Sequence, residues 1–301
     1  RPFGNSSALP AYYCALMAKN DGVTKLLAGD GGDELFGGNS RYAKQRVFDW
    51  YGNVPRTLRH TLLEPLFATA VAAKTPGLRK AASYIEQARV PMPERMEIYN
   101  LLLRLGPDAV LTPQFLAQTD RKEPGGQQRE VWAKAATDSQ VNRALAFDWR
   151  YTLAESDLPK VSGATALAGV DVGFPLLDAE LLAFSLRLPT EYKLKGLKLR
   201  WFFKEALRGF LPDQIIAKKK HGFGLPTAHW LRSHAPLEAL AYDALAALKR
   251  RGVFRPAFID RLLEGHRNAD VRRYKNYFGD HIWTLMILEL WLEAHDAIPA
   301  K

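Results

Sequence analysis

Apolar residues stand at two different spacings in the first part of the chain. Between Ser6 and Lys19 they recur about once per helical turn, which predicts a helix with a serine at its N-cap. The next apolar residues form one short uninterrupted run from Val23 to Ala28. A run of this kind that ends directly in glycine is typical of a buried strand leading into a turn. The pattern therefore predicts a helix, a strand and a turn, in this order.

Beyond Gly38 the periodicity is that of helices almost throughout. A polar stretch at residues 120–128 predicts an exposed loop, and residues 157–159 predict a turn. Helices are expected over residues 42–51, 56–73, 78–87, 93–104, 139–152, 179–186, 199–210, 237–250, 255–265 and 280–295. The chain is thus expected to be α/β in class and predominantly helical.

The densest chemistry follows the predicted strand, at residues 28–42, where glycines alternate with the carboxylates Asp30, Asp33 and Glu34. Glycine lets main-chain N–H groups approach a ligand closely, and carboxylates suit a hard cation such as Mg²⁺. Because α/β proteins bind ligands at the carboxyl ends of their strands, we expect a site for Mg²⁺ and phosphate here. The alternative is a tight turn that Asp and Gly build for structural reasons alone.

Residues 28–42 resemble the Ser-Gly-Asp-Gly-Gly-Asp-Glu-Leu-Phe-Gly-Gly-Tyr segment of the synthetase domain of glutamine-dependent asparagine synthetases. Further elements resemble family motifs in the family's order, and the resemblance extends from the start of the chain to about residue 235. They are residues 1–10 (Pro-Phe-Gly-Asp-Ser-Ser-Ala-Ile-Pro in the family), 157–161 (Leu-Leu-Pro-Lys-Val-Asp), 174–178 (Val-Pro-Phe-Leu-Asp) and 220–226 with Trp230 (Lys-Lys-Gly-Phe-Gly-Val-Pro…Trp).

The resemblance implies a fold: the C-terminal part of an adenine-nucleotide alpha-hydrolase-like domain (a PP-loop ATP pyrophosphatase) with a short parallel-sheet remnant. Residues 1–45 would then end the nucleotide-binding α/β core, and residues 46–301 would be mostly helical. The family's upstream Ser-Gly-Gly-x-Asp-Ser loop and its glutaminase domain are not found in these residues. We therefore expect an incomplete synthetase domain that is inactive by itself.

The resemblance also implies roles for the residues after the strand. Asp33 matches the position that ligates Mg²⁺ on ATP, and Asp30 matches an acid that handles a proton or positions the amine. Glu34 is expected to serve the turn itself. Main-chain contacts to the nucleotide are implied for Ala28, Gly29, Gly31 and Gly32.

Basic residues further along the chain complete the implied site. Lys220 matches a lysine that contacts phosphate and stabilises charge developing in the adenylation step. Arg200 and Lys204, four residues apart on one face of a predicted helix, match basic positions of a family helix, and phosphate contact is one interpretation of them. Ordinary surface charge is the other.

The implied reaction is ATP-dependent formation of an amide from a carboxylate, aspartate by default, with ammonia delivered from glutamine. Four residues depart from the family pattern: Ser162 replaces Asp, Gly163 replaces Arg, Gly173 replaces a second Arg, and Asp171 replaces a Glu. Glycine cannot take over the pairing that a guanidinium makes with a carboxylate or phosphate. Two alternatives therefore stay open: a paralogue that amidates another carboxylate in polysaccharide or natural-product assembly, and a non-catalytic binding module.

Composition narrows these possibilities only slightly. The net charge of +10 and the pI near 9.6 suit an anionic nucleotide as well as a nucleic acid. The basic residues are mixed with acids and form no recognisable nucleic-acid module, so no nucleic-acid partner is expected.

The apolar runs and the cysteine content bear on the surroundings of the protein. No run is long enough for a membrane span, and residues 282–292 are expected to form a core helix instead. Cys14 is the sole cysteine, which excludes an intrachain disulfide, fits a cytoplasmic protein and predicts a small buried side chain. A homodimer is a further expectation from the family.

Overall fold

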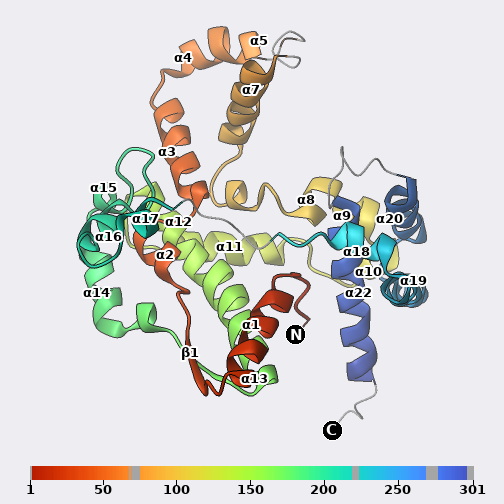
Figure 1. Ribbon diagram of the computed structural model, residues 1–301. Coiled ribbons are helices and arrows are strands. Elements are labelled where there is room, and N and C mark those ends of the chain that lie inside the picture. Colours follow the sequence, from red (N-terminus) through yellow and green to blue (C-terminus); the bar gives the residue numbers. More distant parts are fainter. Residues whose placement is uncertain (1, 68, 70–74, 219–223, 269–276, 297–301) are drawn as a thin grey trace.

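The computed structural model describes residues 2–67, 69, 75–218, 224–268 and 277–296 (Figure 1). Two short strands, β1 (Lys25–Leu27) and β2 (Asp171–Gly173), form a parallel sheet. The other regular elements of the described residues are helices (Figure 1). The mostly helical α/β class is therefore confirmed, and the strand expected at residues 23–28 is confirmed in its central part. The sheet takes its second strand from the region beyond residue 45.

One long helical stretch leads towards β2. It consists of α12 (Gln140–Asp148), a π-helical segment η3 (Trp149–Asp157) and α13 (Leu158–Ala168). Pro159 lacks an N–H, and in a regular α-helix its ring would collide with the carbonyl four residues before it. The wider π-helical turns before α13 accommodate this residue. The turn predicted at residues 157–159 is therefore wrong, because the helix continues through it.

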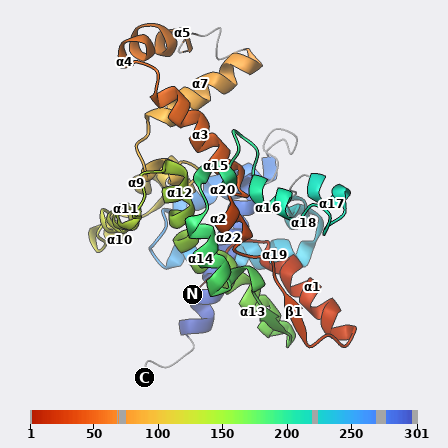
Figure 2. The same ribbon diagram turned by 90° about the vertical axis from the view of Figure 1, so that its left-hand side faces the viewer.

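Helix α1 (Ala8–Asn20) packs against α13 beside the sheet (Figures 1 and 2). It confirms the first predicted helix. Little of its surface is buried, since Ala15 is its one buried residue within the described chain. Cys14 is exposed. The expectation of a buried cysteine is therefore wrong, because the apolar spacing of this helix does not correspond to a buried face within the described residues.

A group of helices projects from the rest of the molecule (Figure 2). It begins with α3 (Ser40–Gly52) and returns with α7 (Pro76–Arg89), which confirms the helices expected at residues 42–51 and 78–87. Between them lie α4 (Arg56–Leu58), η1 (Arg59–Leu63) and α5 (Glu64–Phe67). The helix expected at residues 56–73 is therefore confirmed over residues 56–67, as three consecutive helical segments, and most of the remainder lies outside the described residues.

Two further predictions in this half are wrong. The helix expected at residues 93–104 is divided into η2 (Glu94–Glu97) and α8 (Leu101–Leu105). The loop expected at residues 120–128 is largely helical, because α11 (Glu123–Lys134) begins there. Pro124 lies in the first turn of α11, where a missing N–H leaves no helical hydrogen bond unmade. A proline followed by glycines had indicated a loop, although this position suits a helix start.

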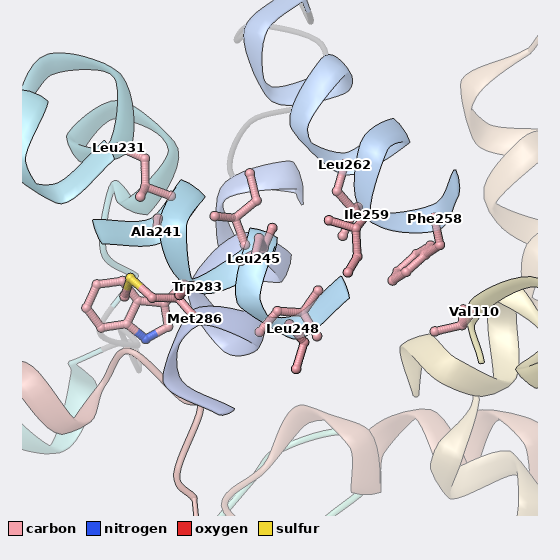
Figure 3. Close-up of a cluster of buried hydrophobic side chains, with 13 residues drawn as sticks. Val110, Leu231, Ala241, Leu245, Leu248, Phe258, Ile259, Leu262, Trp283 and Met286 are labelled. Atoms are coloured by element: carbon pink, nitrogen blue, oxygen red, sulfur yellow. The ribbon is translucent and has the colours of Figure 1, made fainter. Parts of the chain in front are cut away.

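The largest apolar core lies in the C-terminal helices (Figure 3). Leu245, Ile259 and Ile282 are fully buried in it, and Val110 reaches it from α9 (Pro107–Val110). The helices that build it are α18 (Thr227–Ser233), α19 (Ala235–Arg250), α20 (Pro256–Asn268) and α22 (Tyr277–Asp296). The core helix expected at residues 282–292 is confirmed as part of α22. No described helix has both the length and the apolar character that a membrane crossing requires.

A short helix at the centre of the other half positions the predicted site. This is α2 (Gly32–Phe36), which follows β1 and contacts α12, α14 (Ala179–Arg187) and α16 (Trp201–Ala206). A second apolar cluster around Phe36 and Leu188 holds these elements together. The remaining elements are α10 (Pro113–Ala117), η4 (Pro175–Leu177), α15 (Thr190–Lys193) and α17 (Asp213–Ala217).

Candidate functional site

The loop after β1 is built around two glycines that admit close neighbours. The backbone of Gly31 is left-handed (φ 92°), and a Cβ there would lie 2.2 Å from Cδ2 of Leu177. A Cβ on Gly32 would lie 2.8 Å from Cδ1 of Leu176. The segment before α14 therefore packs directly on the loop, and at Gly31 only glycine permits both the conformation and the contact. The glycines of this motif have a packing role in addition to any ligand role.

A cavity of about 430 Å³ opens at this loop, at the carboxyl end of β1. Of the nine site residues expected from the sequence, six line it: Gly29, Asp30, Gly31, Gly32, Asp33 and Arg200. Asp157, Lys160, Glu34, Leu176 and Phe203 complete its wall. Segments more than a hundred residues apart in the sequence therefore meet at one cavity.

Two expected residues that the structure describes do not line the cavity, and a third is not described. The N–H of Ala28 donates to the carbonyl of Gly173 (2.9 Å) and so continues the sheet. Lys204 lies on α16, and its N–H donates to the carbonyl of Arg200 (3.0 Å). Lys220 lies outside the described residues.

Asp33 faces Arg200 across the cavity. Its Oδ1 lies 3.9 Å from Nη1 of Arg200, which is an ion pair too long for a hydrogen bond. A Cβ on Gly38 would lie 1.8 Å from the same Oδ1 and 2.9 Å from Cδ of Arg200. Gly38 therefore leaves the space that both side chains occupy.

The backbone of Arg200 differs from the prediction. Arg200 precedes α16 in the left-handed conformation (φ 52°), and its N–H donates to the carbonyl of Gly37 (3.2 Å). The prediction that Arg200 and Lys204 share one helix face is therefore wrong, because the bond to Gly37 ties Arg200 to the α2 loop. The Nε of Arg200 is buried and has no hydrogen-bond partner within the described chain.

Asp30 lies near an ion pair that the sequence analysis did not assign to the site. Lys160 donates from Nζ to Oδ1 of Asp157 (2.6 Å), three residues before it on the helical stretch. Burial raises the pKa of Asp30, the charge of Lys160 opposes that rise, and Asp157 and Asp33 add to it. Lys160 and Asp157 belong to the family-like motif at residues 157–161, which was the signal available in the sequence.

Glu34 is the most buried acid of the cavity, with 8% of its surface exposed. Burial raises the pKa of Glu34 from 4.5 to about 7, and the nearby Asp33 adds to the rise. At neutral pH a large part of this carboxyl is therefore protonated. The expectation that Glu34 serves the turn rather than the reaction stays a prediction.

The charged groups of the cavity fit a metal that arrives with phosphate. The described residues contain no group of three or more His, Cys, Asp or Glu placed to hold a metal ion. Mg²⁺ in proteins is commonly held by one or two carboxylates together with the phosphate oxygens of a substrate. Asp33 and Asp30 supply such carboxylates, and Arg200 and Lys160 supply cations beside them. The cavity thus suits a Mg²⁺–polyphosphate rather than a free cation.

The four departures from the family pattern, Ser162, Gly163, Asp171 and Gly173, are not among the residues that line the cavity. Ser162 and Gly163 are exposed on α13, and a Cβ on Gly163 would meet nothing within 4 Å. Gly173 lies in β2, where a Cβ would be 3.3 Å from Cδ2 of Leu27. The substitutions therefore change a face beside the sheet and leave the wall of the cavity unaltered.

Comparison with known proteins agrees with these motifs. A family model described as asparagine synthase matches residues 1–293. Asparagine synthetase (glutamine-hydrolyzing) 1 of Bacillus subtilis (strain 168) is 24% identical over 297 residues, which cover 96% of this chain and 43% of that protein. A putative asparagine synthetase of Mycobacterium tuberculosis (strain H37Rv) is 24% identical over 314 residues, covering 99% and 44%.

A third relative matches a shorter part of the chain. Putative asparagine synthetase (glutamine-hydrolyzing) 2 of Methanocaldococcus jannaschii is 41% identical over 58 residues, which cover 19% of this chain and 11% of that protein. The chain spans less than half the length of the first two relatives. No solved structure gives a significant match. The family model nevertheless covers nearly the whole sequence, and the chain belongs to the asparagine synthase family.

Proposed function

We propose that this chain is the ATP-dependent synthetase part of an amidotransferase. A carboxylate would attack the α-phosphorus of ATP, giving an acyl-adenylate and pyrophosphate, and ammonia would then displace AMP to form an amide. Aspartate is the default acceptor, and the family relation points to a glutaminase domain as the source of ammonia. The observation that carries the proposal is one cavity at the end of β1 that combines Asp33, Arg200 and Lys160.

Each residue of the cavity would have a separate role in binding Mg·ATP. Asp33 would hold the Mg²⁺ that accompanies ATP, and this ion supplies charge neutralisation for the phosphates when bound. Gly29, Gly31 and Gly32 would offer main-chain groups to the nucleotide. Arg200, whose guanidinium stands 3.9 Å from the carboxylate of Asp33, would bind phosphate oxygens beside it. Lys204 and Lys220 are proposed to add positive charge near the phosphates, in a domain of the PP-loop ATP pyrophosphatase type.

Asp30 would act on the attacking amine. When ammonia adds to the acyl carbon, a C–N bond forms, the bond to AMP breaks, and the new nitrogen must lose protons. A carboxylate whose pKa is raised by burial is a better proton acceptor than an ordinary aspartate. Lys160 stabilises the ionised form of Asp30 and so keeps it ready to accept a proton.

A second acceptor class is favoured by the altered face beside the sheet. Ser162 and Gly163 are exposed on α13, and Gly173 lies in the neighbouring strand β2. Loss of two guanidinium groups removes partners for an acidic acceptor. We therefore propose, as the alternative, amidation of a carboxylate other than aspartate, as in polysaccharide or natural-product assembly.

The decisive experiment measures AMP release with Mg·ATP and ammonia across a panel of carboxylic acids that includes aspartate. It uses the full-length protein that contains this chain, with the 301-residue chain alone as a second sample that we expect to be inactive. AMP release with aspartate supports an asparagine synthetase, and release with another acid alone supports the alternative. Absence of AMP with every acid, despite binding of Mg·ATP, would favour a non-catalytic module.

Substitution of Asp33 tests the site itself. Asp33→Asn should lower AMP release on the order of 100-fold, because it removes the charge that would hold the metal. Asp108→Asn is the matched control, since Asp108 is an exposed carboxylate paired with Arg121 (2.7 Å) outside the cavity. Equal activity of the two variants would contradict the assignment of Asp33.

A further inference from the structure

A second cavity, of about 510 Å³, lies beside α2 and is separate from the proposed ATP site except at one residue. Residues of α2, α12, η3, α14 and α15 line it, together with the segment that joins α11 to α12. Its walls are largely apolar and include Leu145, Trp149 and Leu182. Glu34 lines both cavities. Largely apolar walls with a few polar groups are typical of sites for small molecules.

Lys193 is the polar group that distinguishes this cavity. It ends α15, it is 4% exposed, and its side chain forms neither a hydrogen bond nor an ion pair with the rest of the described chain. Burial lowers the pKa of Lys193 to about 8, so the amine still carries a proton at neutral pH. A buried ammonium without a counter-ion is costly, and native proteins normally pair such a charge.

A second polar atom in the same wall also lacks a partner. Oδ1 of Asn142 is buried and accepts no hydrogen bond within the described residues. Buried carbonyl oxygens are nearly always hydrogen-bonded, by protein or by a ligand. The cavity thus offers one unpaired positive charge among apolar side chains, and Asn142 with its unpaired oxygen belongs to the same wall.

We infer that this cavity binds a small carboxylic acid with an apolar body, whose carboxylate pairs with Lys193. A carboxylate supplies the missing counter-ion, and the apolar body displaces water from the walls formed by Leu145, Trp149 and Leu182. The inference does not depend on the proposed reaction, because the site is defined without the nucleotide.

The test is calorimetric titration of the 301-residue chain, without nucleotide, with phenylacetate, 4-methylpentanoate and the uncharged isostere phenylacetamide. Binding of an acid about tenfold tighter than the amide is the expected result, because the charged pair forms only with the acid. Lys193→Met should remove this preference. Lys198→Met, at an exposed lysine five positions further on, should leave it unchanged.

A second variant covers the case in which Lys193→Met fails to fold. Ala146 lines the cavity from an exposed position on α12, so Ala146→Trp should fill the space while the core stays intact. We expect this variant to lose binding of the acid. Equal binding of acid and amide, full binding by either Lys193→Met or Ala146→Trp, or no binding of any acid to the unaltered chain would each overturn the inference.

Discussion

The C-terminal helices and the region around the sheet bury their apolar residues to very different extents. Leu245 and Ile282 are fully enclosed among α19, α20 and α22. By contrast, Leu27 of β1 is 73% exposed, and Tyr13 and Met17 of α1 are each 63% exposed. Parallel strands are usually covered on both faces, yet these two strands leave an apolar surface open. The C-terminal core is therefore closed, whereas the sheet region exposes apolar side chains of the described chain to solvent.

The two regions also differ in the charges that they bury. The C-terminal core holds Glu289 in an ion pair with Arg251 (2.6 Å), so its buried charge is matched. The region of the cavities holds Glu34 and Lys193 with shifted pKa values and no ion pair between them. Such groups lower the stability of the folded state and are typical of functional sites. We infer that stability resides mainly in the C-terminal helices and chemistry in the region of α2.

The largest change in the free energy of unfolding is expected from a substitution in the C-terminal core. Leu245→Ala should lower the free energy of unfolding by about 2–5 kcal/mol, because it leaves a cavity among fully packed helices. Urea unfolding followed by circular dichroism measures this loss. A loss below about 1 kcal/mol would show that the C-terminal core is less closely packed than its burial indicates.

Protonation of Glu34 should make the free energy of unfolding depend on pH. Its pKa is raised from 4.5 to about 7, so the folded state keeps a proton that the unfolded chain has lost. The free energy of unfolding should therefore fall as the pH rises from about 4.5 to about 7, by an amount on the order of 3 kcal/mol. Urea midpoints at pH 5 and pH 8 for the native sequence and for Glu34→Gln measure it. The pH effect should be smaller in Glu34→Gln, and an equal effect in both would exclude Glu34 as its source.

Two glycine-to-alanine substitutions compare a position at the cavity with a position on the exposed surface. In Gly38→Ala the new methyl group meets Asp33 at 1.8 Å, and binding of Mg·ATP should weaken about tenfold. In Gly163→Ala the new methyl group meets nothing within 4 Å. The free energy of unfolding should therefore rise by about 0.5–1 kcal/mol, because alanine favours the helix over glycine. Calorimetric titration measures the first effect and urea unfolding the second. Similar nucleotide affinity in both variants would contradict the placement of Asp33.

The smallest effect should come from the open side of the sheet. Leu27→Ser should change the free energy of unfolding of this chain by at most about 0.5 kcal/mol, because most of the side chain already contacts solvent. Urea unfolding of the 301-residue chain measures this change. A loss as large as that of Leu245→Ala would show that the two regions are equally closed.

Local signals were reliable where one element could be interpreted without its neighbours. The helices at residues 179–186 and 237–250 and the strand before Gly29 follow the expected pattern. Pattern reading failed where a contact elsewhere in the fold decided the geometry. Arg200 left its expected helix because its N–H bonds to Gly37, and Cys14 stayed exposed although its surroundings are apolar.

The sequence by itself determined the family, the mostly helical α/β class and the glycine-rich loop with its carboxylates, because these depend on residues adjacent in the chain. Only the tertiary structure decided that Lys160 and Arg200 join that loop in one cavity. It alone also placed Lys193 in a second cavity without a counter-ion. These properties depend on burial and on the distance between side chains that are remote in the sequence. Both quantities arise only when the chain is folded, so local sequence patterns do not reveal them.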